Sequence, residues 1–578
     1  MNSSKLSRLR AHRSRLALLA ALPLIGGGIY AAVGLTASAQ ADGSGGPGLA
    51  PGNLLLFTST YATPSITPGS TVLPPGCTAA SAAASGTPCS TAGYSGAYPQ
   101  SFNNDADDGS FGITSPIILD ELNPLSGHLL DTIPVPTSDL VTSFSSKSEG
   151  ALNLSTDGRY VSFMGYAAPS AGVDVSASNA PGEVDPTDPV TSSYYRTVAT
   201  LDSRGQFHFT ETNAYTGDNG RAAIVADSDG SNPTIFMAGN AGNGNATFPP
   251  PSGTGQFSGV VLGAGAQSIA PSLGSEAFQN PGLPTPVGSF DVTQLGDKQD
   301  KIGKDDNFRG MTISGNVLYY TKGSGSNGVN TVYFVDTTGK ACPNGVGLPQ
   351  PGAPLPTAPI DYNLSAIQAG GALPSNMCIL KGFPTLIAKS TTGVSYPFGI
   401  WFANAHTIYL ADEGSGSNTY SSTTGMYTDA VPANNPTAGL QKWVFDPTTG
   451  QWNLAYTLTS GLDLGQPYVV PGYPTGDNPE TSLPWAPATD GLRNITGRVN
   501  PNGTATIWAE SSTVSGGGDQ GADPNKLYMV TDHLGATTLP ANESFQTIDL
   551  AGFGQVFRGV SFTPGTGTEG HGPPWGGR

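Results

Sequence analysis

A glycine-headed β-hairpin recurs along this chain and constrains the fold more than any other feature. In each copy a glycine opens a short apolar run, a tight turn follows, and a second apolar run comes next. Five copies and a truncated sixth begin at Gly150, Gly220, Gly310, Gly399, Gly491 and Gly559. A hairpin repeated every 68 to 92 residues is typical of a β-propeller, whose blades are small antiparallel sheets around one axis.

The composition indicates a turn-rich all-β protein. Of 578 residues, 79 are Gly and 49 are Pro, while 11% are charged. Apolar runs between such turn formers predict short strands. A bare blade takes about 40–50 residues, so the longer glycine intervals predict loop insertions. We expect one β-propeller of six four-stranded blades. Seven is the alternative, if the interval from Gly220 to Gly310 holds an extra blade.

The two ends of the chain carry their own predictions. A basic start, an apolar stretch and Ala37-Ser38-Ala39 predict a signal peptide over 1–39, with an uncleaved membrane anchor as the alternative. We expect residues 40–52 to be a flexible leader, 53–564 to form the propeller, and 565–578 to be a disordered Gly/Pro-rich tail.

Ring closure follows from two incomplete units. The strand Val560–Phe562 has no hairpin partner after it, and Leu54–Tyr61 has no inner strand before it. We therefore expect the C-terminal strand to complete the N-terminal blade, which leaves no sheet edge open.

Charge and cysteine content indicate a place outside the cytosol. The net charge of −18 falls to −23 without the five basic residues of the leader, so nucleic acid is disfavoured as a partner. With an export signal, the local cysteine pairs Cys77/Cys89 and Cys342/Cys378 predict two disulfides that staple long loops. We expect a secreted, cell-surface or periplasmic monomer with no membrane contact beyond an N-terminal anchor.

Several segments of the chain resemble a known family. They are SEGALNLSTDGRYVSFMGY, NFRGMTISGNVLYYTKGSGSNGVNTVY, PFGIWFANAHTIYLADEG with GLQKWVFD, and VFRGVSFTPG. The family consists of secreted, mostly bacterial proteins expected to be β-propellers and without a characterised activity. The resemblance implies the architecture and assigns no catalytic residue.

Polar residues beside the opening glycines are candidates for a ligand site. Inner strands of a propeller start at one face beside the channel, so these residues should converge at its mouth: Glu149, Arg221, Asn307, Arg309, Arg493, Asn494 and Arg558. Guanidinium groups bind carboxylates or phosphates through paired hydrogen bonds. We therefore expect an extracellular carbohydrate or a small anionic ligand. In the alternative, the arginines pair with loop carboxylates, Asp305 or Asp306 with Arg309 and Asp490 with Arg493.

Three further features leave the function open. Trp485 lies in a loop before an inner strand and could offer a sugar-stacking surface with Tyr468 and Tyr473, or simply pack its own loop. No cofactor is indicated except calcium, for which the loop carboxylates are Asp105, Asp107 and Asp108, with Asp227 and Asp229 as a weaker group. No G-x-S-x-G or HExxH motif occurs, so the chain is not assigned as an enzyme.

Two other functions stay open beside ligand binding. One is a hydrolase or lyase whose acids line the channel, with Glu149, Asp306 and Arg309 as its parts, because paired carboxylates follow no sequence spacing rule. The other is a structural role in the cell envelope.

Overall fold

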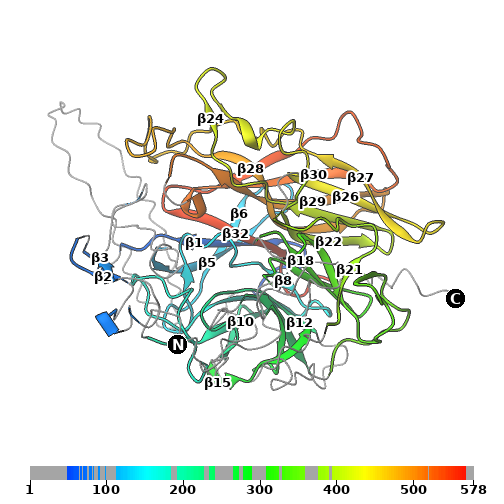
Figure 1. Ribbon diagram of the computed structural model, residues 1–578, viewed down its shortest axis with the longest axis horizontal. Coiled ribbons are helices and arrows are strands. Elements are labelled where there is room, and N and C mark those ends of the chain that lie inside the picture. Colours follow the sequence, from blue (N-terminus) through cyan, green and yellow to red (C-terminus); the bar gives the residue numbers. More distant parts are fainter. Residues whose placement is uncertain are drawn as a thin grey trace, which may run out of the picture. The chain divides into compact units, whose positions relative to one another are not determined.

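Six small antiparallel sheets form a six-bladed β-propeller in the computed structural model of this protein (Figure 1). The described residues belong to one compact unit, Pro47–Arg578. They are 48–63, 66–67, 69–73, 77–80, 83, 89–91, 98, 112–183, 192–226, 233–240, 265–272, 278–288, 307–324, 328–357, 375–389, 393–517 and 520–567.

The first three blades each run from an inner strand at the channel to an outer strand. Blade 1 is β32 (Gln555–Phe562), β1 (Leu54–Thr60), β5 (Ile117–Leu122) and β6 (Leu129–Pro134). Blade 2 is β8 (Asn153–Leu154), β9 (Tyr160–Tyr166), β10 (Arg196–Asp202) and β11 (Phe207–Thr212), with β15 (Phe278–Gly282) added at its outer edge. Blade 3 is β12 (Gly220–Ala226), β13 (Thr234–Gly239), β14 (Ala266–Ile269) and β16 (Thr285–Gly288).

The other three blades follow the same plan. Blade 4 is β17 (Met311–Ser314), β18 (Val317–Lys322), β19 (Thr331–Val335) and β21 (Met377–Leu380), with β20 (Val346–Gly347) at its edge. Blade 5 is β22 (Pro397–Asn404), β23 (Thr407–Asp412), β26 (Gly439–Asp446) and β27 (Gln451–Leu458). Blade 6 is β28 (Ala488–Val499), β29 (Thr504–Val514), β30 (Lys526–His533) and β31 (Gln546–Leu550).

Smaller elements lie in the loops between these strands. They are the strand pairs β2 (Val72–Leu73) with β3 (Ser90–Thr91), β4 (Thr114–Ser115) with β7 (Thr142–Ser143), and β24 (Tyr420–Ser421) with β25 (Met426–Tyr427), and the 3₁₀ turns η2 (Thr428–Ala430) and η3 (Gln520–Ala522).

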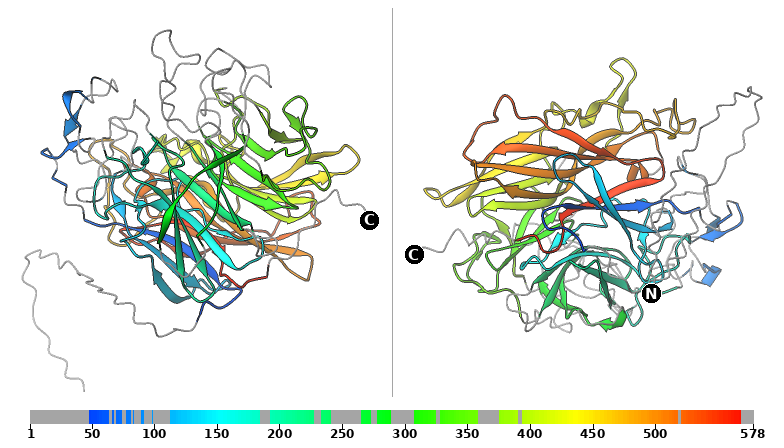
Figure 2. Two further views of the ribbon diagram at one scale, coloured as in Figure 1. Left: turned by 90° about the horizontal axis from the view of Figure 1, so that it is seen from below. Right: turned by 180° about the vertical axis from the view of Figure 1, so that it is seen from behind.

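The predicted ring closure is confirmed. β32 pairs antiparallel with β1, from Leu54 opposite Phe562 to Thr60 opposite Gln555. In Figure 2 the blue β1 and the red β32 lie side by side, although they come from opposite ends of the chain. The six-bladed count is confirmed too, because β14, which lies in the interval between Gly220 and Gly310 that could have held a seventh blade, is the third strand of blade 3.

The repeated glycine allows neighbouring inner strands to approach closely around the axis. A Cβ atom on Gly559 would lie 2.2 Å from the Gly150 carbonyl oxygen, and one on Gly399 would lie 2.6 Å from the Arg493 carbonyl oxygen. The first contact joins β32 to the segment just before β8, and the second joins β22 to β28, so both connect adjacent blades. Only glycine leaves the room that these close backbone contacts need.

The apolar core lies largely between the blades. Aromatic pairs cross successive interfaces, as Phe57 with Phe163 between blades 1 and 2 and Trp508 with Phe562 between blades 6 and 1. Trp443, Trp452 and Trp508 are buried in this core. Trp401 is half-buried, packs against the core between blades 5 and 6, and also lines the channel.

Both predicted disulfides are present, Cys77–Cys89 and Cys342–Cys378. Each closes a local loop, with sequence separations of 12 and 36 residues.

No helix in the described part of the chain is long and apolar enough to cross a bilayer. The predicted leader over 1–39 lies outside the described residues, so the signal peptide stays a prediction.

Candidate functional site

A polar cavity of about 300 Å³ opens at the face where the inner strands begin. Its charged side chains come from blades 4, 5 and 6 and from a loop after β7. They are Lys147, Arg309, Glu413, Asp490 and Arg493. Neutral hydrogen-bonding side chains complete the lining, among them Ser324, Asn330, Tyr396, Thr513 and Gln520. We call this cavity the mouth site.

Arg493 is held by a carboxylate from the neighbouring blade. Its Nε lies 3.2 Å from Glu413 Oε2, and both side chains are buried. Burial by itself would raise the pKa of Glu413, yet Lys147, Arg309 and Arg493 hold that pKa below its usual value. Glu413 is therefore ionised and partly neutralises a cluster of three cationic side chains.

Arg309 has no carboxylate partner among the described residues, and Asp305 and Asp306, its alternative partners from the sequence, lie outside them. Its side chain is 7% exposed, and its Nε has no hydrogen-bond partner. Within the described residues its guanidinium makes no ion pair and lies 5.9 Å from the ring centre of Phe398. Burial, and then the nearby Arg221, lower the pKa of Arg309 to about 9, so it still carries its charge at neutral pH. A buried polar group without a hydrogen-bond partner is unfavourable, and a ligand that accepts a hydrogen bond from it removes that cost.

Asp490 is a carboxyl group that titrates near neutral pH. Burial, with the nearby charges of Glu413 and Asp412, raises the pKa of Asp490 to about 7. A hydrogen bond from the Gly416 amide opposes this rise. The Gly416 nitrogen lies 2.7 Å from Oδ2, whereas Oδ1 is buried without a hydrogen-bond partner. Half-buried Tyr396 lines the same cavity, and burial followed by Asp412 and Asp490 raises its pKa as well.

The loop after β23 wraps around Asp490 and requires a glycine. Gly414 has φ +81°, a left-handed conformation that L side chains rarely adopt. A Cβ atom there would also lie 2.4 Å from Asp490 Oδ2. The sequence Glu413-Gly414-Ser415-Gly416 thus positions both the Glu413 carboxylate and the Gly416 amide at the mouth site.

Replacing Gly414 should therefore weaken ligand binding at the mouth site in addition to lowering stability through backbone strain. Gly414→Ala should displace Asp490 and weaken ligand binding at the mouth site, besides a strain cost of about 1–2 kcal/mol. Gly450→Ala is the matched control, because Gly450 has φ +60° but a Cβ atom added there would meet no atom within 4 Å. Thermal unfolding and ligand titration of both variants check this. If Gly414→Ala and Gly450→Ala bind the ligand with the same affinity, the proposed role of the loop is contradicted.

The other arginines named from the sequence serve the blade interfaces. Arg221 donates to Asn219 Oδ1 at 2.8 Å, to the Phe308 carbonyl at 2.8 Å, and to Asn307. Arg558 donates to the carbonyls of Phe144 and Gly521. Since each arginine reaches across to another blade or loop, both connect parts of the ring.

Glu149 and Asn494 are likewise bound by the protein itself. Glu149 accepts hydrogen bonds from Thr142, the Ser143 amide, Tyr166 and Asn219. Burial and the nearby Asp174 raise its pKa to about 7. The Asn494 amide donates to Glu510 at 3.1 Å and to the Arg558 carbonyl at 2.6 Å. Of the seven residues expected at the mouth, Arg309 and Arg493 line the cavity.

Trp485 is not among the residues that line the mouth site. It is half-buried, and its amide donates to the Gly476 carbonyl at 2.9 Å. Its expected companions are engaged elsewhere, Tyr468 with the Pro524 carbonyl and Tyr473 with Asp523. This arrangement resembles the alternative in which Trp485 packs its own loop.

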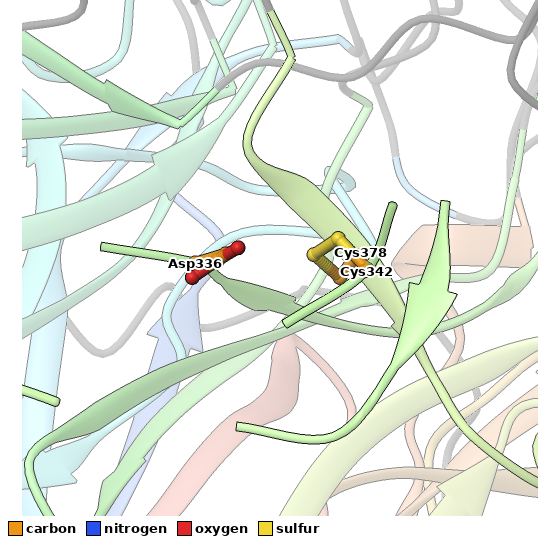
Figure 3. A group of neighbouring side chains, drawn as sticks. All are labelled: Asp336, Cys342 and Cys378. Atoms are coloured by element: carbon orange, nitrogen blue, oxygen red, sulfur yellow. A yellow bond between two sulfur atoms is a disulfide. The ribbon is translucent and has the colours of Figure 1, made fainter. Parts of the chain in front are cut away.

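The calcium candidates lie beyond the described residues, since Asp105, Asp107, Asp108, Asp227 and Asp229 all fall outside them. Within the described part of the chain, one group of metal-ligand types comes together, Asp336 with Cys342 and Cys378 (Figure 3). The two sulfurs form a disulfide, and Asp336 accepts hydrogen bonds from the amides of Thr338, Gly339 and Ala341. These partners account for the group without a metal.

Among the ionisable side chains that line the mouth site, sequence reasoning missed Lys147, Tyr396 and Glu413. Glu413 directly follows β23, so a search of both strand ends at this face would have found it. In the alternative drawn from the sequence, Arg493 pairs with a loop carboxylate, but that carboxylate is not Asp490. Arg493 pairs instead with Glu413, because the end of β23 lies beside the start of β28.

Comparison with known proteins adds little to this picture. No family model matches the chain, and no curated protein matches it. Among solved structures it is similar to a polysaccharide lyase described as an ulvan lyase of a new family. That likeness covers 78% of this chain and 90% of the lyase chain, with 12% sequence identity and a TM-score of 0.24. A similarity of this size does not bear on activity.

Proposed function

We propose that this protein binds a small anionic ligand, a sugar acid foremost, at the mouth site. The observation that carries the proposal is Arg309, a buried guanidinium at the cavity wall that has no carboxylate in ion-pair range among the described residues and no hydrogen-bond partner at its Nε. Lys147 and Arg493 add positive charge beside it. A guanidinium and a carboxylate match each other through two parallel hydrogen bonds.

The neutral lining supports a sugar as the body of the ligand. Ser324, Asn330, Thr513 and Gln520 offer hydroxyl and amide groups that could bind ring hydroxyls. The volume of about 300 Å³ is at the lower end of small-molecule sites. The paired cysteines favour an oxidising compartment, which is where free or polymeric sugar acids outside the cytosol would be met.

Arg309→Gln should abolish most of this binding. A hydrogen bond to a charged group contributes about 1.5–3 kcal/mol, so affinity for galacturonate should fall about 10- to 150-fold. Calorimetric titration with galacturonate, and with galactose as the uncharged counterpart, measures this. Arg498→Gln is the matched control. Arg498 lies near the end of β28, whereas the residues of β28 that line the mouth site, Asp490 and Arg493, lie nearer its start. A wild-type chain that binds neither sugar acid nor other small carboxylates would favour the purely structural role.

Binding should weaken as the pH rises through 7. Below that pH Asp490 is neutral and the mouth site is more positive, whereas above it Asp490 is ionised and repels the anion. A sugar carboxylate itself stays ionised across this range, as ordinary carboxyl groups do. If ligand binding raises the pKa of Asp490 by about one unit, affinity for galacturonate should be about fivefold lower at pH 8 than at pH 6. Asp490→Asn should flatten the profile, and an unchanged profile would contradict the assignment.

A second candidate function is cleavage of a glycosidic bond as a hydrolase or lyase. Asp490 favours it, because a carboxyl group that is protonated near neutral pH, with Oδ1 free of partners, can act as a general acid. Incubation with uronate oligosaccharides, followed by product analysis, tests this. Turnover that Asp490→Asn abolishes while galacturonate still binds would identify an enzyme; binding without turnover would leave a binding protein.

A further inference from the structure

A second cavity lies along the same channel and differs from the mouth site in chemical character. Its volume is about 980 Å³, near the upper end of small-molecule sites. Each of the six inner strands contributes at least one apolar side chain to its wall, among them Leu154, Ile224, Ile313, Ile400, Ile495 and Phe562. Half-buried Trp401 adds an aromatic face. We call this cavity the channel site.

The channel site follows the inner strands rather than forming a round pocket. On β28 its lining runs from Ile495 to Val499, a rise of about 13 Å for four residues of extended chain. At this wall Leu154, Ile313 and Trp401 are half-buried, and the apolar surface that they keep in contact with water is unfavourable. A ligand with an extended apolar body would remove that surface from water.

One charge stands at this apolar wall. Among the described residues that line the channel site, Arg498 alone is charged. Its guanidinium lies 5.8 Å from the ring centre of Trp508 and 5.9 Å from that of Phe562. Its side chain is exposed, and within the described residues it has no carboxylate in ion-pair range. Stacking on two aromatic rings holds this cation in place beside the apolar wall.

We infer that the channel site binds a single-chain amphiphile, a linear hydrocarbon chain that carries one anionic headgroup. The chain lies along the apolar side chains of the six inner strands, and the headgroup pairs with Arg498. This inference does not depend on the sugar-acid function of the mouth site, because the two cavities share no lining residue.

Titration with a series of fatty acids tests the inference. Decanoate, dodecanoate and tetradecanoate, each kept below its micelle concentration, are added to the full chain while tryptophan fluorescence and binding heat are recorded. Burial of each methylene should tighten binding about fourfold. Arg498→Gln should weaken dodecanoate about fivefold, as expected for a partly exposed ion pair, and should leave the uncharged dodecanol unchanged.

Two further variants separate the channel site from other causes. Ile313→Gln replaces an apolar wall residue and should weaken both dodecanoate and dodecanol; if it unfolds, Thr496→Trp, which fills the cavity from a half-buried position, takes its place. Arg309→Gln, at the mouth site, should leave both affinities unchanged. The inference is overturned if the affinity for fatty acids does not change with chain length, or if neither Ile313→Gln nor Thr496→Trp weakens the binding of dodecanoate. It is also overturned if dodecanoate binds only after residues 568–578 are removed, since that segment would then be the occupant.

Discussion

A chain that ends before Gln555 should fail to fold at all, rather than lose one strand. β32 forms the innermost strand of blade 1, and its removal would strip β1 of its hydrogen-bonded partner along seven residue pairs. Val556, Phe557, Val560 and Phe562 are buried and would leave the core with it. Because every blade of a closed ring packs against two neighbours, an open edge exposes apolar surface on both sides of the gap.

Circular dichroism and thermal unfolding measure the effect of this truncation. A chain that ends at Gly567 keeps β32 and is the control; it should unfold like the full chain. A point variant tests the same strand without truncation. Val560→Asp places a charge at a position that is 0% exposed, and it should lower the free energy of unfolding by roughly 4–5 kcal/mol or more. Cooperative unfolding near the temperature of the full chain would show that the ring does not depend on its last strand.

Loss of the Asp532 carboxylate should destabilise the contact between blades 5 and 6. Asp532 on β30 is 0% exposed, and it accepts hydrogen bonds from Lys442 at 2.8 Å and from the hydroxyls of Tyr409 and Tyr456. Lys442 is 1% exposed and also donates to the His533 carbonyl at 2.6 Å. These hydrogen bonds join three strands of blade 5 to one strand of blade 6.

Asp532→Ala should lower the free energy of unfolding by about 3–5 kcal/mol, because it removes the carboxylate that pairs with the buried Lys442 charge. The double variant Lys442→Met with Asp532→Leu should recover much of that loss, since apolar side chains of similar size can replace a buried ion pair. Guanidinium unfolding of the wild type, the single variant and the double variant measures both effects. A single variant as stable as the wild type would show that water or the neighbouring Glu543 replaces the Asp532 carboxylate beside Lys442.

Much of the fold was predictable because its causes are local. The glycine at the head of each hairpin is visible in the sequence, and the structure explains it by the close approach of Gly559 to Gly150 and of Gly399 to Arg493. The turns that join strands use residues with strong local preferences, as in the connection between β5 and β6. The two disulfides were predictable because each pair of cysteines is close in sequence.

The candidate site was predictable only in part. Reasoning from the opening glycines found Arg309 and Arg493, because inner strands begin at a common face. It could not find that Arg221 and Arg558 are occupied by backbone carbonyls of other blades. Lys147 escaped it because its position at the mouth site depends on the path of a loop after β7.

By itself the sequence determined a closed ring of hairpin-built blades, because glycine placement, strand alternation and local cysteine pairs act over short stretches of chain. Only the tertiary structure decided which charges are neutralised. Arg493 meets Glu413 across 80 residues, while Arg309 meets no carboxylate in the described part of the chain. The physical reason is that an ion pair depends on distances of a few ångströms between blades, and nothing in the spacing of residues along one strand fixes those distances.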